Sequence, residues 1–428
     1  MIGTDEFQGR RVAFVSTRIA GTDGVSLEIE KWAAVLERAG VECVYIAGES
    51  DRTADRTRLI GEAHFKHPAI FDSTRRAFAS GVRSPQLTDD ILHLAQTIRA
   101  PLRQALDDFR VDAVIAQNAL TIPMNIPLGI ALVQVLQETG LGCVAHHHDF
   151  YWERERFLTS GVDDFLHYAF PPPLSHIQHV AINSLAGDEF TRRTGLSCRV
   201  IPNVMDFANP PEPPDDYARS FRSGIGLADD ELLILQPTRV VERKGIEHSV
   251  ELVRRLPGRR ARLVITHASG DEGEGYANFL RLFSDLISVD VLFASDSIAE
   301  HRGASNTGKR LFTLHDAYQA ADLVAYPSEY EGFGNAFLEA VYYRKPIFCQ
   351  RYPIYRSDIE PCGFQTVAFD EFVTRDTVDQ VARLLDDESA FNAIVNHNYE
   401  VARRHFSYEV LASELYPLLR RAFVPCSE

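Results

Sequence analysis

Short apolar runs alternate with segments of helical periodicity along most of the chain. In the first half these runs predict β-strands at residues 11–16, 41–46, 111–116, 142–146, 180–182 and 199–201. In the second half they predict β-strands at residues 232–236, 262–266, 289–293, 323–326 and 346–349. Strands that alternate with helices are typical of parallel α/β units. The pattern therefore predicts an α/β protein with two Rossmann-like, doubly wound parallel-sheet domains.

A proline-rich stretch, Asn209-Pro-Pro-Glu-Pro-Pro-Asp-Asp216, separates the two series. Four prolines disfavour both a helix and a central strand, so the stretch is expected to be a semi-rigid linker. The resulting division is an N-terminal domain at 1–208, a linker at 209–222, a second domain at 223–405 and a C-terminal segment at 406–428. Apolar residues at helical spacing predict a helix at about 408–422.

The amino-acid composition of the chain limits the kinds of molecule that it is expected to bind. The chain has 428 residues, of which 45% are apolar, enough for a substantial core in each domain. The 44 Lys and Arg against 60 Asp and Glu leave a net charge of −16. This acidic excess disfavours broad binding to nucleic acid or to anionic membranes. Six scattered cysteines without a CxxC pair, and a start without a secretory signal, favour a reduced cytoplasmic protein.

The uncharged stretch from Ala113 to Gln137 is long enough to span a bilayer. It contains several amides and two prolines, which are costly in lipid. We therefore expect a buried strand, a loop and a helix, and no stable membrane anchor.

Ligands of open parallel sheets lie beyond the carboxyl ends of the strands. Polar residues follow many of the predicted strands in both domains. The first domain offers the Gly21/Gly24 loop, Asn118, the cluster His146-His147-His148-Asp149, Asn183-Ser184 and Asn203. The second offers Arg239 with Lys244, His267, Ser295 and the segment Ser328 to Gly334. The two sets are expected to face each other across a central cleft.

The segment from Ala321 to Ala340 is the most informative. A buried strand is expected to end at Tyr326, and a helix to begin near Gly334 after a glycine-containing loop. Backbone N–H groups and the positive end of the helix dipole would then form a site for a diphosphate. Glu339 would accept hydrogen bonds from a ribose diol. On spacing alone, Glu339 is equally well explained as a solvated helix residue and Gly334 as a packing device.

Three motifs together resemble the retaining GT-B glycosyltransferases of family 4, also called group 1. Glu331 and Glu339 are separated by seven residues, like the E-x7-E motif of that family. The segment from Arg239 to Gly245 resembles the R-x4-K-G loop that binds donor phosphate, and Val200-Ile-Pro-Asn-Val-Met-Asp206 resembles the IPNGVD signature. The resemblance covers about residues 10 to 422, and it implies a C-terminal helix that returns to the N-terminal domain.

The resemblance also implies roles for the donor side. Arg239 and Lys244 would neutralise the leaving nucleoside diphosphate, where fixed cations are most useful. Glu331 would contact the transferred sugar and Glu339 the ribose. Further donor-binding candidates are Phe333, Gly334, Asn335, Ala336 and, in the first glycine loop, Gly24.

The histidine cluster does not predict a metal site. Adjacent histidines on a strand alternate faces, so they cannot all bind one ion. His148 and Asp149 resemble the H-D step of family 4, in which the histidine contacts the sugar's primary hydroxyl. Acceptor-side candidates are Asp149, Asn118 and Arg18. The following residues, FYWERER, are expected either to shape the acceptor pocket or to form aromatic core with an exposed charged turn.

Three other segments have weaker interpretations. The loop from Thr17 to Ser26 lacks G-x-G-x-x-G, which argues against a nicotinamide cofactor. The segment from Gly303 to Arg310 nearly matches a P-loop, but Arg310 replaces the required hydroxyl, and a mobile surface loop is expected. The acidity of the segment from His267 to Tyr276 argues against a phosphate contact there.

Together these features predict a retaining hexosyltransferase. The expected donor is a GDP- or UDP-sugar, and the expected acceptor is a hydroxyl of a small polar molecule or saccharide. No cofactor is expected, and no metal, because Arg239, Lys244 and the helix start near Gly334 supply positive charge and no D-x-D motif stands at a strand end. The departing diphosphate is expected to take the acceptor proton. The alternatives are a GT-B nucleotide-sugar epimerase, a sugar phosphorylase and a catalytically silent sugar-nucleotide-binding regulator.

Overall fold

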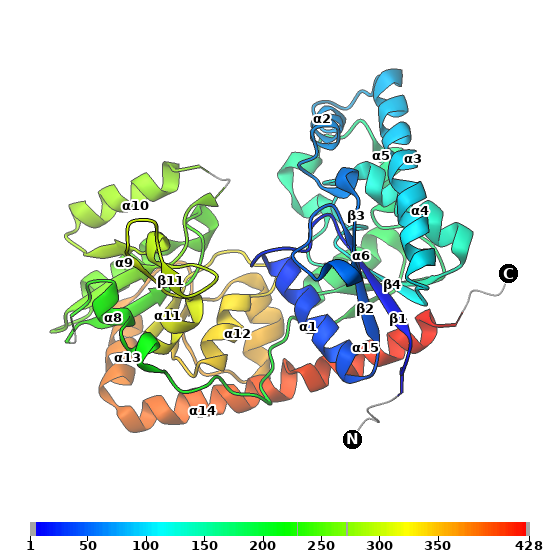
Figure 1. Ribbon diagram of the computed structural model, residues 1–428. Coiled ribbons are helices and arrows are strands. Elements are labelled where there is room, and N and C mark those ends of the chain that lie inside the picture. The colour runs from blue at the N-terminus through cyan, green and yellow to red at the C-terminus, as the bar shows by residue number, and fades with distance from the viewer. Residues whose placement is uncertain (1–5, 229, 271–272, 425–428) are drawn as a thin grey trace. The chain divides into compact units, whose positions relative to one another are not determined.

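The computed structural model describes residues 6–228, 230–270 and 273–424. It divides into two compact units (Figure 1). Unit 1 comprises Met1–Val204 with Tyr408–Glu428, and unit 2 comprises Met205–Ser407. Each unit is built on its own parallel β-sheet flanked by helices. The expected α/β fold with two Rossmann-like domains is therefore confirmed.

The sheet of unit 1 has seven parallel strands in the order β3-β2-β1-β4-β5-β6-β7. Their bounds are β1 Arg11–Val15, β2 Glu42–Ala47, β3 Thr57–Leu59, β4 Ala113–Gln117, β5 Gly142–His147, β6 Ile177–Ala181 and β7 Cys198–Val200. Every residue of β4 and β5 is buried, as expected for central strands covered on both faces. The six predicted strands of this half are confirmed to within a few residues. The additional strand, β3, is short and lies at the sheet edge.

Helices cover both faces of this sheet (Figure 1). The helices are α1 Gly24–Arg38, α2 Pro68–Ala77, α3 Pro85–Asp108, α4 Ile126–Thr139, α5 Asp163–Ala169, α6 Ser184–Thr194 and α15 Tyr408–Ala422. Short turns lie at η1 Ala54–Arg56, η2 Gly61–Ala63, η3 Tyr151–Glu153 and η4 Glu155–Phe157. One apolar core joins the sheet to α3, α4 and α5, and a second joins it to α1 and α15.

The end of the chain completes unit 1. Helix α15 lays its apolar residues Leu411, Leu415 and Leu419 into the core beside α1. The Tyr416 hydroxyl donates to the Val35 carbonyl at 3.2 Å. The C-terminal helix therefore belongs to the same unit as the N-terminal sheet.

The uncharged stretch at 113–137 forms β4, a loop and most of α4, as predicted. Asn125 caps α4 by accepting a hydrogen bond from the Leu128 N–H at 2.9 Å. Within the described part of the chain, no helix is both long and apolar enough to cross a membrane.

The sheet of unit 2 has six parallel strands in the order β10-β9-β8-β13-β14-β15. Their bounds are β8 Leu232–Gln236, β9 Ala261–Ile265, β10 Val291–Phe293, β13 Leu323–Tyr326, β14 Ile347–Gln350 and β15 Val367–Phe369. The five predicted strands are confirmed, and the short edge strand β15 is an addition. The turns and helices are η5 Glu242–Lys244, α9 Ile246–Arg255, α10 Gly275–Leu286, η7 Ser295–Ser297, α11 Leu314–Ala320, α12 Asn335–Tyr342, η8 Tyr355–Ile359, η9 Glu360–Cys362, α13 Arg375–Asp386 and α14 Glu388–His405.

The proline-rich stretch contains no helix or strand before Asp216, and two short helices, α7 Asp216–Arg219 and α8 Phe221–Gly224, follow it within residues 209–224. Asp215 caps α7 by accepting a hydrogen bond from the Ala218 N–H at 2.8 Å. The prolines end at Pro214, so nothing prevents helix formation beyond that point.

The segment resembling a P-loop forms a short hairpin at the surface, and its expected mobility stays a prediction. Strand β11 Gly303–Ala304 pairs antiparallel with β12 Arg310–Leu311. The turn is closed by a hydrogen bond from the Ser305 N–H to the Lys309 carbonyl at 2.8 Å. The guanidinium carbon of Arg310 lies 3.8 Å from the centroid of the Tyr217 ring, which anchors the hairpin on α7. These contacts hold both ends of the segment in place.

Candidate active site

A buried ion pair joins the two main motifs of unit 2. The ammonium of Lys244 contacts the Oε1 atom of Glu331, and both side chains are about 10% exposed. The Nη1 atom of Arg243 lies 3.5 Å from the Oε2 atom of Glu331 and donates to the Tyr330 carbonyl at 3.2 Å. The predicted candidates Lys244 and Glu331 therefore lie together, with Arg243 beside them.

Backbone contacts fix this pair in place. Gly245 ends the η5 turn with a left-handed φ of 54°. A Cβ atom at Gly245 would lie 2.6 Å from the Pro327 carbonyl oxygen. Both this close approach and the left-handed backbone conformation require glycine at this position. The Glu329 N–H also donates to the Arg243 carbonyl at 3.0 Å. The loops after β8 and β13 are thus tied to each other at the carboxyl edge of the sheet.

The local charges favour an ionised carboxylate. Burial by itself raises the pKa of Glu331, but the positive charges of Lys244 and Arg243 outweigh it and hold that pKa below its ordinary value. Burial lowers the pKa of Lys244, and the charge of Glu331 acts in the opposite direction. Lys244 and Arg243 both contact the single carboxylate of Glu331. The cluster of these three side chains therefore has a net positive charge, which favours binding of an anion.

Arg239 lies on the loop that follows β8, beside the turn that follows β9. Its Cδ atom is 3.8 Å from the position that a Cβ of Gly270 would occupy, and Gly270 has a positive φ of 68°. The Val240 N–H donates to the Ala268 carbonyl at 3.3 Å. Burial, and then the charges of Lys244 and Arg239, lower the pKa of His267. His267 is therefore a neutral neighbour of both predicted phosphate-binding cations.

Part of the acidic segment after β9 cannot be compared with its prediction, because Asp271 and Glu272 lie outside the described residues. The expectation that this segment makes no phosphate contact stays a prediction.

Helix α12 begins at Asn335, directly after Gly334, as predicted. Gly334 has a φ of 132°, and a Cβ there would lie 2.5 Å from the Tyr352 hydroxyl oxygen. Glycine has no side chain with which to cap the helix. The first turn, which includes Asn335 and Ala336, therefore has no cap from the side chain of its N-cap residue, and the positive end of the helix dipole lies there.

Two further donor-side candidates, Phe333 and Glu339, are held by aromatic residues. The Phe333 ring is 2% exposed and packs on Phe406 with 5.3 Å between centroids, so only its backbone could contact a ligand. Glu339 is half-buried, and its Oε2 atom accepts a hydrogen bond from the Tyr318 hydroxyl at 2.7 Å. This contact gives the Glu339 carboxylate a fixed orientation.

In unit 1, His148 and Asn118 lie together at the carboxyl edge of β4 and β5. The His148 backbone N–H donates to the Oδ1 atom of Asn118 at 3.2 Å. The Oε1 atom of Gln117 lies 3.1 Å from Nε2 of His148 and 2.9 Å from Nδ1 of His146. Burial lowers the pKa of His148 to about 4, which keeps its imidazole neutral near pH 7.

The other two histidines of the cluster are core residues. His146 is 1% exposed and stacks on Trp32 with 4.2 Å between ring centroids. His147 is equally buried, and its Nε2 atom lies 3.0 Å from Nδ1 of His179. Among the described residues no group of three or more His, Cys, Asp or Glu side chains could hold a metal ion. Five cysteines are free thiols, and the sixth, Cys426, lies outside the described residues.

Asp149 is engaged through both carboxylate oxygens. Its Oδ1 atom accepts a hydrogen bond from Asn118 at 3.1 Å, and its Oδ2 atom accepts one from Nε of Arg154 at 2.6 Å. A carboxylate held in this way is poorly placed to act as a general base. Asn118 itself has a positive φ of 58°, a conformation that asparagine tolerates better than most residues.

In the first glycine loop a carboxylate caps the following helix. Asp23 caps α1 and accepts hydrogen bonds from the N–H groups of Val25 and Ser26. The Nη2 atom of Arg18 lies 3.1 Å from Oδ2 of Asp23. The donor contact at Gly24 stays a prediction.

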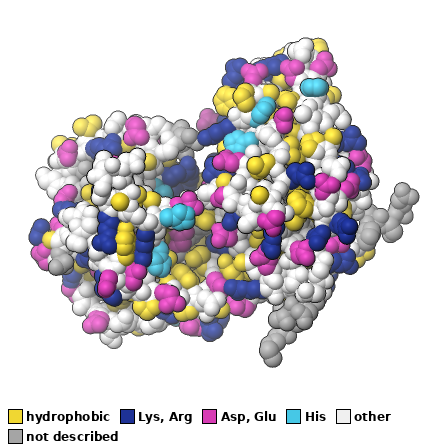
Figure 2. All heavy atoms as spheres, viewed as in Figure 1, with side chains coloured by type: hydrophobic (Ala, Val, Ile, Leu, Met, Phe, Trp, Pro, Cys, Tyr) yellow, Lys and Arg dark blue, Asp and Glu magenta, His cyan; other side chains and the backbone are white. Residues whose placement is uncertain are grey.

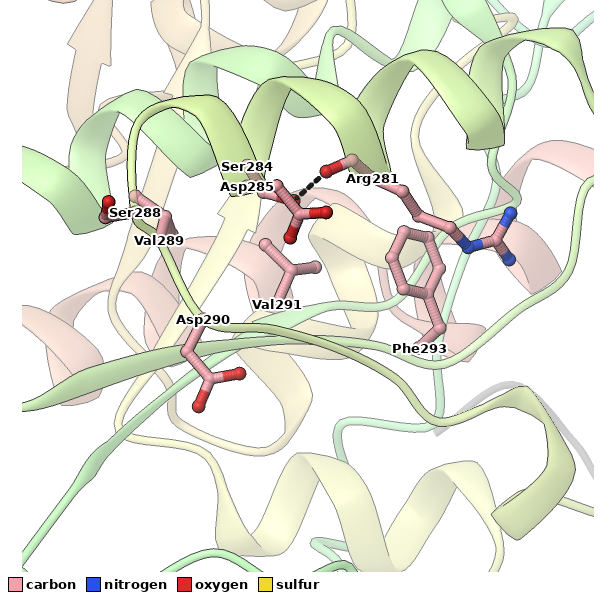
Figure 3. A pocket seen from close by; sticks show the side chains of 8 residues that line it. All are labelled: Arg281, Ser284, Asp285, Ser288, Val289, Asp290, Val291 and Phe293. Atoms are coloured by element: carbon pink, nitrogen blue, oxygen red, sulfur yellow. Dashed lines mark hydrogen bonds between the residues drawn. The ribbon is translucent and has the colours of Figure 1, made fainter.

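A hollow of about 560 Å³ lies beside α10 and edge strand β10 (Figure 3). Arg281 lies 4.6 Å from the centroid of the Phe293 ring, and Asp290 pairs with Arg262 at 2.6 Å. Asp285 adds a second carboxylate to the lining. None of the motif residues lines this hollow, and its acidic groups disfavour a diphosphate.

Charges of both signs are mixed on the surface. On the face shown in Figure 2, Lys and Arg side chains lie among Asp and Glu side chains on each unit. A nucleic-acid-binding face would instead need a continuous basic surface. This face has no such surface among its described residues.

Several residues at these sites were absent from the sequence-based candidates. They are Arg243, which contacts Glu331; Gln117, which contacts two histidines; Tyr318, which orients Glu339; and Asp23, which caps α1. Arg243 and Gln117 are sequence neighbours of the predicted candidates Lys244 and Asn118. Their positions in the sequence could therefore have indicated that they belong to the site. Tyr318 and Glu339 are brought together only by the packing of α11 on α12.

Comparison with known proteins agrees with this geometry. Residues 307–401 match the family model described as glycosyl transferases group 1. The chain is similar to the mannosylglucosylglycerate synthase of Thermotoga maritima, with 31% identity over 95% of this chain and 100% of the relative.

Two solved structures share the fold. A glycosyltransferase from Rickettsia africae aligns with a TM-score of 0.67 at 12% identity and covers 97% of this chain and 99% of its own. Anabaena HepE in complex with UDP-glucose aligns with a TM-score of 0.62 at 13% identity and covers 96% and 99%. The fold is therefore GT-B. With the full-length relative at 31% identity, these matches show that the chain belongs to the group 1 glycosyltransferases.

Proposed function

We propose that this chain transfers a hexosyl group from a nucleotide diphosphate sugar to a hydroxyl of a small anionic saccharide such as glucosylglycerate. The name of the Thermotoga maritima relative specifies mannosyl, glucosyl and glycerate groups, and that relative aligns along its whole length. Anabaena HepE was solved with UDP-glucose, which supports a nucleotide-sugar donor. The proposed donor is a GDP- or UDP-hexose, with a GDP-hexose tested first.

The observation that carries this proposal is the Lys244–Glu331 pair, with Arg243 beside it and the start of α12 following the same loop. A leaving diphosphate develops negative charge as the sugar departs, and fixed cations stabilise that charge. In this scheme Lys244 and Arg239 bind the diphosphate, Glu339 binds the ribose and Glu331 contacts the sugar. These protein groups supply the positive field, and we therefore propose a reaction that is independent of metal and cofactor.

We further propose that the reaction retains the anomeric configuration. Inversion needs a general base behind the anomeric carbon. Asp149 has both oxygens engaged, and the pKa of His148, lowered to about 4 by burial, makes it a weak base near neutral pH. Retention follows if the departing diphosphate takes the proton of the acceptor hydroxyl on the same face of the sugar.

The direct test is a donor and acceptor matrix with the purified chain. GDP-mannose, GDP-glucose and UDP-glucose are each combined with glucosylglycerate, and product formation is followed by mass spectrometry. The expected result is a glycosylated product with one of these donors. Epimerised donor without product would favour an epimerase, and binding without turnover for every pair would favour a regulator.

A further inference from the structure

The segment that follows β5 is anchored by its aromatic residues. The Phe150 ring stacks on Trp152 with 4.5 Å between centroids, and Phe157 packs on Phe78 at 4.8 Å. Phe150 and Phe157 are buried, whereas Arg154 and the residues up to Arg156 are exposed. The turns η3 and η4 therefore present charged side chains from a fixed apolar base.

One carboxylate in this segment is already matched by a cation. Asp149 pairs with Arg154 through its Oδ2 atom and accepts a hydrogen bond from Asn118 on its Oδ1 atom. Asn118 also binds the backbone N–H of His148. The Asp149–Arg154 pair is thus fixed to the residue that the family motif places beside the donor sugar.

Arg156 is a second cation, after Arg154, in the segment that follows β5. Its guanidinium carbon lies 4.6 Å from the centroid of the Phe157 ring. Burial, and then the charge of Arg154, lower the pKa of Arg156, and Asp149 opposes this shift. Within the described ranges no carboxylate forms an ion pair with Arg156. The neighbouring Glu153 accepts a hydrogen bond from the Phe150 N–H at 2.6 Å, and no ion pair among the described residues joins Glu153 or Glu155 to Arg156. The donors of the Arg156 guanidinium therefore have no carboxylate partner there.

We propose that Arg156 binds the carboxylate of the acceptor. A guanidinium offers two parallel N–H donors that match the two oxygens of a carboxylate. The expected ligand is the glycerate group of a small glycoside. This inference rests on the proposed function and names the group that selects its acceptor.

The first experiment compares two acceptors that differ only in charge. Kinetic constants are measured for glucosylglycerate and for its neutral analogue glucosylglycerol, with wild type, Arg156→Gln and Arg156→Lys. Arg156→Gln is expected to raise KM for glucosylglycerate about 10- to 100-fold and to leave kcat, donor KM and the glucosylglycerol constants nearly unchanged. Arg156→Lys should restore part of the loss, because it keeps the charge without the planar fork.

A matched control lies on the neighbouring helix. Arg192 is an exposed cation of α6 that pairs with Glu189 at 2.8 Å, so Arg192→Gln should change neither acceptor's KM. Equal rises in KM for both acceptors in Arg156→Gln would mean a structural role. Unchanged constants in that variant would also overturn the carboxylate site.

A binding measurement separates this inference from the proposed function. D-Glycerate and glycerol are titrated into wild type and Arg156→Gln, and binding is followed by saturation-transfer NMR. D-Glycerate is expected to bind only the wild type, and glycerol neither. If D-glycerate binds only the wild type but the wild type transfers no sugar to glucosylglycerate, the carboxylate site is supported and the proposed reaction is contradicted. If the wild type transfers sugar to glucosylglycerate but D-glycerate binds both proteins equally, the proposed reaction is supported and the carboxylate site is contradicted.

Discussion

Lys244 and Glu331, 87 residues apart in sequence, form a buried ion pair that joins the loops after β8 and β13. Removing one partner of such a pair leaves an uncompensated buried charge. Each substitution here must therefore be judged on stability as well as on turnover.

We expect Lys244→Ala and Arg239→Ala to lower kcat about 100- to 1,000-fold, with a much smaller loss of nucleotide binding. The reason is that the charge on the leaving diphosphate is greatest in the transition state. Steady-state kinetics and UDP or GDP titration measure the two effects. Lys309→Ala, an exposed residue of the β11–β12 turn, is the matched control and should behave as wild type. Full turnover in either site variant would remove that residue from the mechanism.

Glu339→Ala should mainly raise the donor KM, because a ribose contact is made equally in the ground and transition states. Tyr318→Phe should have the same effect in weaker form, since it removes the hydroxyl that orients Glu339. Glu331→Ala should instead lower kcat. Initial rates at varied donor concentration distinguish the patterns, and the opposite assignment would show that the roles of the two glutamates are exchanged.

Activity should survive EDTA. The cations Lys244, Arg239 and Arg243, with the start of α12, are proposed to stabilise the leaving group without a metal. The rate is measured before and after exhaustive chelation and again after addition of Mg²⁺ or Mn²⁺. Complete loss that either ion restores would contradict the proposal.

The product should keep the anomeric configuration of an α-linked donor. Proton NMR of the first product formed reports the coupling constant of the new linkage before any slow rearrangement. A β-linked product would require a general base, and His148 or Asp149 would then be assigned that role despite their present hydrogen bonds.

Unit 1 should lose stability as the pH falls from about 6.5 toward 4. Burial lowers the pKa of both His148 and His179 to about 4, whereas the unfolded chain binds protons at these groups near pH 6.5. The unfolded state therefore gains protons first, and the stability present above pH 6.5 is lost across this window. Thermal unfolding at several pH values measures the slope, and His179→Asn should make it shallower. An unchanged slope in that variant would contradict the assignment.

The sequence alone determined the parts of this protein that depend on local pattern. Central parallel strands are buried on both faces, so β4, β5, β8 and β13 stand out as apolar runs. The start of α12 after Gly334 was readable from glycine and the following helical period. The resemblance of the three motifs to family 4 indicated the glycosyltransferase class.

Only the tertiary structure determined which candidate side chains contact each other and which are already engaged by other residues of the protein. The edge strands β3 and β15 have three residues each, too few for a periodic signal. Asp23 occupies the start of α1, and the Phe333 ring is packed on Phe406, although both segments resemble ligand-binding loops in sequence. Side-chain contacts between distant segments depend on how helices pack on the sheet, and no local spacing encodes that packing.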